Sequence, residues 1–393
     1  MSSRWRSEIF FFPSMREESF HSTTAGGARL RGIPAGRGIS VILLATMIAA
    51  ATTNGQVPKP VVGTATPTAL VEQAPQHDAR FEFHSSFWLN LHLRLYEEAR
   101  QRDGLAVTQG GGVPAAPPIT PISNPAEQKQ WNAAVNYYAA NVARRDLLFD
   151  NILPAITDRL ALLEDCLDLS DRAGPHCVSG LQPELLAALE EAAPVYRSRE
   201  WPGQDRHNRL WVANVAPLVR ELSPALSKKI SRVYQSDWPS APIRVDVAGY
   251  AGPFGAYTTL APARITVSSE DPRNDELPGM EVLFHEASHL LAGKVEEQIA
   301  IECDRQKEPI PRDLWHALIF YTTGVLVQQA LENTSSGVRG AGGVPAYIPY
   351  ARRNALYERD WQNYEKLLRA YWQPYLDGKT DFHQAIMQMV DGL

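Results

Sequence analysis

The chain has 393 residues, of which 44% are hydrophobic and 21% charged, with a formal net charge of −6. This composition is typical of a globular protein with one large or two modest domains. No basic stripe interleaved with aromatic side chains is present, which argues against nucleic-acid binding. The absence of glycine-rich phosphate-binding patterns argues against a nucleotide site.

Residues 1–55 are predicted to direct export. Arginines at 29, 31 and 37 precede an apolar run at 39–51, which has the length and small-residue exit of a secretory signal. The predicted location is therefore periplasmic or secreted. An uncleaved N-terminal anchor is the alternative, although the run is short for a transmembrane helix. Residues 56–79 are rich in proline, threonine and alanine and are predicted to be a disordered linker.

Residues 80–237 are predicted to form a helical domain. Apolar residues recur at helical spacing in several segments, at about 81–100, 126–144, 146–165, 182–197 and 206–235. Cys166 and Cys177 enclose a short polar loop. They are predicted either to form a disulfide in an oxidising compartment or to remain free thiols.

The sequence pattern changes at residue 238, and a second region is predicted from there to residue 393. Alternating apolar and polar residues indicate short strands, at 243–247, 257–260 and 264–268. An apolar helical run at 280–292 follows them. The predicted fold class is mainly α with a small β-sheet, that is, α+β, with a helical N-terminal half.

An H-E-x-x-H motif, His285-Glu286-Ala287-Ser288-His289, lies within this apolar run. Residues four apart share one face of a helix, so both imidazoles can reach a single Zn²⁺. Glu286 lies at the neighbouring edge, where it can take a proton from metal-bound water. Two unpartnered histidines in such apolar surroundings would be costly, which favours a metal site over a hydrogen-bonded histidine pair.

The motif and its surroundings resemble the zincin metallopeptidases. The metzincins extend the motif to H-E-x-x-H-x-x-G-x-x-H. In this chain the glycine, Gly293, lies one residue after the required position, and no third histidine follows at the required spacing. The chain is therefore more similar to the gluzincins. Residues 240–376 are also similar to uncharacterised bacterial exported proteins that carry H-E-A-S-H and L-W-H-A-L-I-F-Y-T. The resemblance implies a zincin-like catalytic region at 238–393, whose edge strand lies along the metal helix and binds an extended peptide.

A catalytic zinc needs a third protein ligand. His316 is the first choice, because it lies among apolar neighbours on a second predicted helix. A glutamate would be the gluzincin ligand, although the N-E-x-x-x-D pattern is absent. Asp313 is predicted either to ligate or to orient a ligand histidine, and Glu281 either to orient a ligand or to be exposed. The acidic alternatives to His316 are Glu296, Glu297, Glu302 and Asp313.

These residues together predict a zinc-dependent hydrolase with a peptide or protein substrate. Zn²⁺ lowers the pKa of bound water to about 7, and Glu286 would act as general base. A tyrosine hydroxyl is expected to stabilise the oxyanion. Tyr350 is the first candidate and Tyr321 the second, and the alternative role of each is packing in the core. Two rival functions stay open: hydrolysis of a non-peptide amide or ester at the same site, and an inactive zincin-like binding protein of the envelope.

Overall fold

A computed structural model describes residues 80–105, 121–148, 150, 152–169, 175–333 and 346–393. The export signal expected at 1–55 and the linker expected at 56–79 lie outside these residues. Among the helices of the described part, none combines the length and apolar character needed to cross a membrane.

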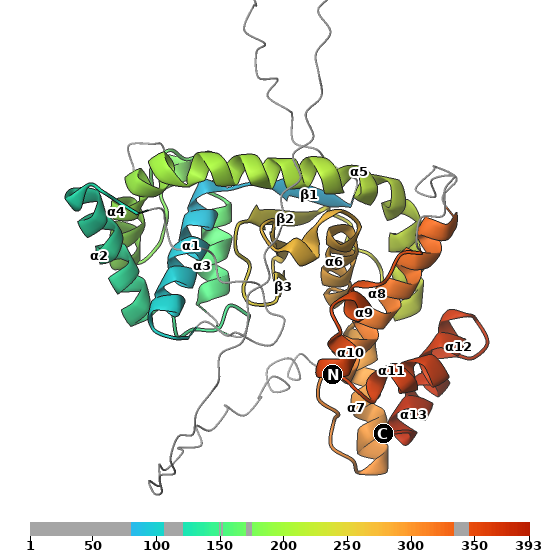
Figure 1. Ribbon diagram of the computed structural model, residues 1–393. Coiled ribbons are helices and arrows are strands. Elements are labelled where there is room, and N and C mark those ends of the chain that lie inside the picture. The colour runs from blue at the N-terminus through green and yellow to red at the C-terminus, as the bar shows by residue number, and fades with distance from the viewer. Residues whose placement is uncertain (1–79, 106–120, 149, 151, 170–174, 334–345) are drawn as a thin grey trace, which may run out of the picture. The chain divides into compact units, whose positions relative to one another are not determined.

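The N-terminal half begins with a strand and continues as helices (Figure 1). The helix expected from residue 81 is wrong at its start, because residues 81–84 form a strand and the helix begins at Phe87. The helix expected at 146–165 is shorter than predicted. The elements are β1 (Phe81–His84), α1 (Phe87–Arg102), α2 (Pro125–Asn141), α3 (Leu153–Ala161), α4 (Pro183–Arg199) and α5 (Trp201–Tyr234).

Helices α1 to α4 enclose an apolar core of their own, built from buried residues such as Trp88, Trp131 and Leu189. The sulfur atoms of Cys166 and Cys177 are joined in a disulfide at the edge of this core. The indole of Trp88 donates a 2.7 Å hydrogen bond to the carbonyl of Cys166, which ties the disulfide loop to α1.

The sheet is mixed, with the strand order β1-β2-β4-β3. β1, β2 and β4 are parallel neighbours, whereas β3 runs antiparallel to β4. Among the described residues, β1 and β3 are the two edge strands. The three expected strands are present, and β1 is an additional one, aligned with Phe81 opposite Ile243. Their bounds are β2 (Ile243–Ala248), β3 (Ala256–Leu260) and β4 (Ala263–Ser268).

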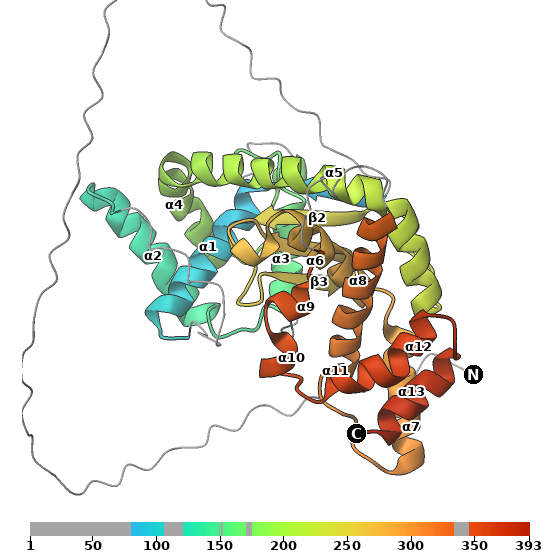
Figure 2. The same ribbon diagram turned by 45° about the vertical axis from the view of Figure 1, so that its right-hand side comes forward.

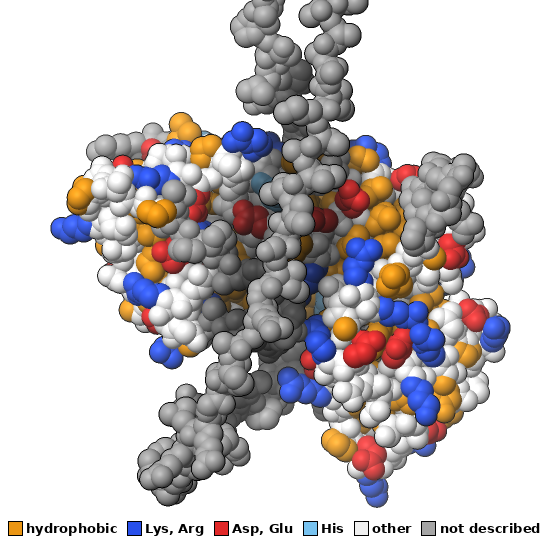
Figure 3. All heavy atoms as spheres, in the orientation of Figure 1, with side chains coloured by type: hydrophobic (Ala, Val, Ile, Leu, Met, Phe, Trp, Pro, Cys, Tyr) orange, Lys and Arg blue, Asp and Glu red, His pale blue; other side chains and the backbone are white. Residues whose placement is uncertain are grey.

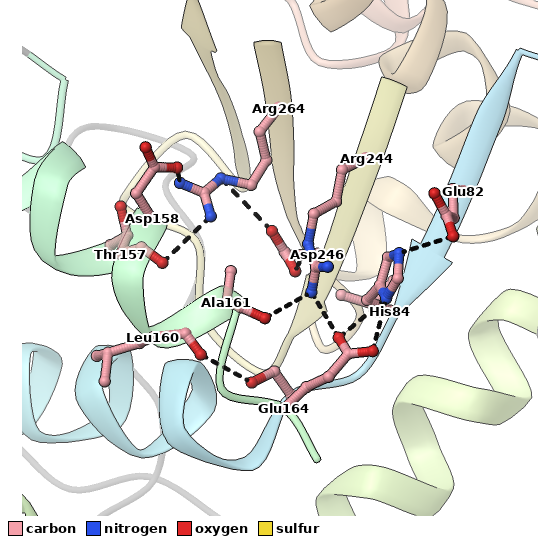
Figure 4. A network of polar contacts seen from close by, with 12 residues as sticks. Glu82, His84, Thr157, Asp158, Leu160, Ala161, Glu164, Arg244, Asp246 and Arg264 are labelled. Atoms are coloured by element: carbon pink, nitrogen blue, oxygen red, sulfur yellow. Dashed lines mark hydrogen bonds and ion pairs between the residues drawn. The ribbon is translucent and has the colours of Figure 1, made fainter. Parts of the chain in front are cut away.

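The two faces of the sheet differ in chemistry. Val245, Val247 and Ile265 are buried in a core that includes α5 and the C-terminal helices. The opposite face carries Arg244, Asp246 and Arg264, which point toward α3 (Figure 4). Strand residues alternate between faces, so each strand serves both sides.

Ion pairs on this charged face fasten α3 to the sheet (Figure 4). Arg264 contacts Asp158 of α3 and lies 3.5 Å from Asp246, measured from Nε to Oδ2. Arg244 lies 2.9 Å from Asp246 and 2.6 Å from Glu164. Because Asp246 and Arg264 are almost fully buried, each needs its partners in place.

The C-terminal half consists of helices packed beside the sheet (Figures 1 and 2). The α+β class is confirmed, because most described residues lie in helices and the strands form one small mixed sheet. A π-helical turn at 368–372 lies between α11 and α12. The helices are α6 (Glu276–His289), α7 (Gly293–Gln306), α8 (Leu314–Asn333), α9 (Tyr350–Arg353), α10 (Leu356–Arg359), α11 (Tyr364–Leu367), α12 (Gln373–Leu376) and α13 (Phe382–Asp391).

The long helix α5 connects the two halves. It contacts α4 and also packs against α6 and α8, and it runs across both halves in Figure 1. All described residues belong to one compact unit, so the boundary expected at 237/238 falls inside that unit, between α5 and β2.

Acidic and basic side chains are interspersed over the C-terminal helices on the face shown in Figure 3. Arg352 and Arg369 both pair with Glu365, each at 2.9 Å. Part of this charge is therefore neutralised locally.

Candidate metal centre

Helix α6 carries the H-E-x-x-H motif through the middle of the C-terminal core. Every residue from Pro278 to Ser288 is buried, and the helix packs against β3, β4, α5 and α8. A helix buried on all sides is expected to carry mainly apolar side chains. The histidines and glutamates of α6 are therefore exceptions in the core that need partners.

Helix α8 supplies the third histidine. His316 lies in its first turn, and α8 packs along α6, beside which it lies in Figures 1 and 2. Most of α8 is apolar and buried, from Leu314 to Ala330. Burial of α8 against α6 therefore brings together histidines that are separated in the sequence.

The three imidazoles converge through their Nε2 atoms. Nε2 of His285 lies 3.2 Å from Nε2 of His289 and 3.3 Å from Nε2 of His316. Nitrogen atoms bound to Zn²⁺ at about 2.0–2.1 Å in a tetrahedron are about 3.3–3.4 Å apart. The spacing and the donor type both fit a zinc site with three histidine ligands.

A hydrogen-bonded histidine cluster is the competing account of these distances. Nε2 of a neutral imidazole carries either one proton or one lone pair, so it forms one good hydrogen bond. His285 nevertheless directs Nε2 toward two other Nε2 atoms at nearly equal distance. A shared cation would satisfy three lone pairs at once, which a hydrogen-bonded cluster does not.

Burial keeps these imidazoles neutral. It lowers the pKa of His289 to about 3 and that of His316 to about 4. The pKa of His285 is lowered further below its ordinary value by burial and then by the two neighbouring histidines. A metal ligand must be unprotonated, and imidazoles with pKa values lowered in this way meet that requirement at neutral pH.

Glu286 is held beside the histidines by strand β3. The hydroxyl of Thr258 donates a 2.7 Å hydrogen bond to its Oε2 and also lies 2.8 Å from its backbone carbonyl. Burial raises the pKa of Glu286 to about 7, and the Thr258 hydrogen bond opposes that rise. A carboxylate with a pKa near neutrality is suited to general base chemistry.

Aromatic rings surround the histidines. Phe320, one turn after His316, stacks on His285 with ring centroids 3.5 Å apart. Trp315 contacts His289 and His316, and Trp361 contacts His316 at 5.5 Å. Neither Thr258 nor these rings were predicted from the sequence to belong to the site, although Phe320 follows His316 by one helical turn.

The two predicted tyrosines differ in their surroundings. Tyr350 lies beside Phe320, with ring planes 16° apart. Burial raises the pKa of Tyr350, and nearby carboxylates, Glu286 among them, add smaller contributions. Tyr321 donates a 2.8 Å hydrogen bond to Gln373. That bond connects α8 to α12, whereas the ring of Tyr350 contacts Phe320 beside His285.

The acidic alternatives to His316 lie outside the group of converging ligand atoms. Glu302 pairs with Arg305 at 2.7 Å, and Asp313 with Arg312 at 3.4 Å. Glu296 and Glu297 lie on α7. Glu281, one turn before His285, is fully buried and accepts hydrogen bonds from Tyr347 and Tyr350 instead of from a ligand histidine.

Comparison with protein-family models, with curated proteins and with solved structures found no match to this chain.

Proposed function

We propose that the chain is a zinc-dependent hydrolase of the zincin type that cleaves peptide bonds. The observation that carries the proposal is the convergence of three neutral imidazoles, on His285, His289 and His316, beside the buried carboxylate of Glu286. Three histidines leave a fourth position of a zinc ion open. A neighbouring general base would have no purpose in a purely structural zinc site.

The residues divide the chemistry between them. A zinc ion held by the three histidines would polarise a substrate carbonyl and acidify a water molecule. Glu286 takes the proton of the attacking water and returns it to the leaving nitrogen, while Thr258 holds its Oε2 in place. Tyr350 donates a hydrogen bond to the developing oxyanion.

The edge strand supports a peptide substrate over a smaller amide or ester. β3 pairs with β4 on one side only among the described residues, and its Thr258 contacts Glu286. An extended peptide that adds to β3 as a further strand would pass beside the catalytic carboxylate. This relation between edge strand and metal helix is what the zincin resemblance implies.

We also propose that the protein is exported. Two features support this, the apolar segment near the N-terminus and the disulfide between Cys166 and Cys177. Disulfides persist in oxidising compartments. Fractionation of cells that produce the full chain, with N-terminal sequencing of the mature protein, tests this: a cytoplasmic protein with an intact N-terminus contradicts it.

Zinc stoichiometry of the purified protein is the first test. We expect one zinc ion per chain, and its loss in His285→Ala, His289→Ala and His316→Ala, because each removes one of three ligands. His207→Ala is the matched control, since His207 is exposed and contacts the carbonyl of Ser269. Full zinc retention in His316→Ala would contradict the three-histidine site.

Glu286→Gln separates an enzyme from a binding protein. We expect the variant to keep its zinc and to lose activity by roughly 10²–10⁴-fold, measured by mass spectrometry of a peptide library. Cleavage by the unaltered protein that survives in Glu286→Gln would remove Glu286 from the mechanism. Amide or ester probes cleaved in place of every peptide would favour the non-peptide hydrolase.

A further inference from the structure

Glu281 is a fully buried carboxylate that joins the metal helix to a distant segment. Its Oε2 accepts a 2.7 Å hydrogen bond from the Tyr347 hydroxyl, and both carboxylate oxygens lie 3.0 Å from the backbone nitrogen of Tyr350. Tyr350 is the first residue of α9, so its N–H has no acceptor within that helix. Glu281 supplies the acceptor and thereby fixes where α9 begins.

The ring of Tyr350 is the outer member of a stack that ends on a histidine. Tyr350 lies over Phe320, with centroids 5.8 Å apart and planes at 16°. Phe320 in turn lies over His285, at 3.5 Å and 22°. The backbone position that Glu281 fixes is therefore connected to the orientation of the His285 ring.

His285 lacks the usual means of orientation. Metal-binding histidines commonly donate their second ring nitrogen to a carboxylate or carbonyl, which fixes the ring. Nδ1 of His285 is buried and has no hydrogen-bond partner among the described residues. Stacking is thus the contact that defines how Nε2 of His285 faces the other two histidines.

We propose that Glu281 is a positioning residue of the metal centre, acting through Tyr350 and Phe320 on the ring of His285. The inference rests on the proposed function in one respect, the identity of the three histidines as ligands. Glu281 has no direct contact with the cation in this proposal. It holds Tyr350 at the site and limits rotation of His285.

Residue-resolved hydrogen exchange and zinc affinity test the proposal on the full chain. In Glu281→Ala we expect exchange of the Tyr350 amide to accelerate at least about tenfold, because a buried hydrogen bond to a carboxylate is lost. The dissociation constant for zinc should rise roughly 10-fold or more. Glu281→Gln keeps one acceptor oxygen and should recover most of both losses.

Two controls separate positioning from general loss of stability. Val327→Ala truncates a buried side chain of α8 and should lower stability while leaving zinc affinity unchanged. Glu297→Ala removes an exposed carboxylate of α7 and should change neither measurement. Equal losses of zinc affinity in Val327→Ala and Glu281→Ala would overturn the proposal, as would normal zinc binding in Glu281→Ala.

The same measurements distinguish failure of the proposed zinc site from failure of the positioning role of Glu281. The exchange experiment is performed on metal-free protein, so protection of the Tyr350 amide is measurable whether or not zinc binds. No zinc in the unaltered chain would remove the metal centre and, with it, the role of Glu281 there. Zinc bound normally, with an unprotected Tyr350 amide already in the unaltered chain, would remove only the positioning role.

Discussion

Two carboxylates of α6 share a raised pKa and differ in what surrounds them. Burial raises the pKa of both Glu281 and Glu286 to about 7. Glu281 is held by a phenol and a backbone N–H of the segment that begins α9, whereas Glu286 has the hydroxyl of Thr258. The first arrangement connects two parts of the chain, and the second holds a carboxylate next to the histidines.

The raised pKa of Glu281 predicts a pH-dependent contribution to stability. A buried carboxyl with a pKa of about 7 is protonated in the folded chain over a range where the unfolded chain is ionised. Its favourable contribution is fully present below the ordinary glutamate pKa, near 4.5, and is lost as the pH rises to about 7, by about 3 kcal/mol.

Denaturant unfolding of the metal-free protein between pH 4.5 and 8 measures the contribution of Glu281 to the unfolding free energy, as a difference between variants. Glu281→Gln removes the titrating group, so its unfolding free energy should fall less across this range than that of the unaltered chain. Glu297→Gln, at an exposed position, should follow the unaltered chain. Parallel pH profiles for Glu281→Gln and the unaltered chain would show that Glu281 does not titrate in this range.

Sequence patterns identified the residues whose chemistry is local and missed those defined by tertiary contacts. His285, Glu286 and His289 follow from helical spacing, and His316 follows from an imidazole among apolar neighbours. Thr258 had no such signal, because its role depends on β3 lying beside α6. The role of Glu281 cannot be chosen from the sequence for the same reason, since its partner Tyr350 is distant in the sequence.

At the scale of elements, a glycine sets how closely α8 meets the segment before α9. A Cβ on Gly324 would lie 2.7 Å from Cβ of Pro349 and 3.2 Å from Oε1 of Glu281. Gly324→Ala should therefore displace that segment and lower the unfolding free energy by about 1–3 kcal/mol. Amide exchange at Tyr350 should accelerate with it.

Gly293 provides the matched control for Gly324. It lies at the start of α7, and a Cβ there would meet nothing within 4 Å. Gly293→Ala should be neutral or stabilise by roughly 0.4–1 kcal/mol, because alanine restricts the unfolded chain. Thermal unfolding compares the two variants, and a Gly324→Ala as stable as Gly293→Ala would mean that Pro349 moves aside without cost.

β1 shows why one element could not be predicted from its own residues. Phe81-Glu82-Phe83-His84 alternates over four residues only, directly before a helix. Its parallel partner β2 begins at Ile243, far along the chain. The three strands near the metal helix were recognisable because their alternation is bounded by glycines and proline, whereas β1 is a strand by virtue of its partner.

At the scale of the whole molecule, the core around the three histidines is shared by both halves of the sequence. Phe81 and Phe83 of β1 are buried in the same apolar core as α6 and α8. From Trp211 onward, α5 contributes a row of buried side chains to that core, including Trp211, Val215, Val219, Leu226 and Ile230. The C-terminal half therefore cannot bury its apolar surface by itself.

This sharing predicts that the halves fold only together. Residues 238–393 produced alone would expose the free edge of β2 and the apolar surfaces that β1 and α5 cover, so we expect no cooperative unfolding and no zinc binding above that of the His285→Ala chain. Residues 80–237 produced with them in the same cell should restore both. Residues 80–393 as one chain are the control. Cooperative thermal unfolding of 238–393 alone, with zinc bound at one ion per chain, would show that β1 and α5 are dispensable for the metal centre.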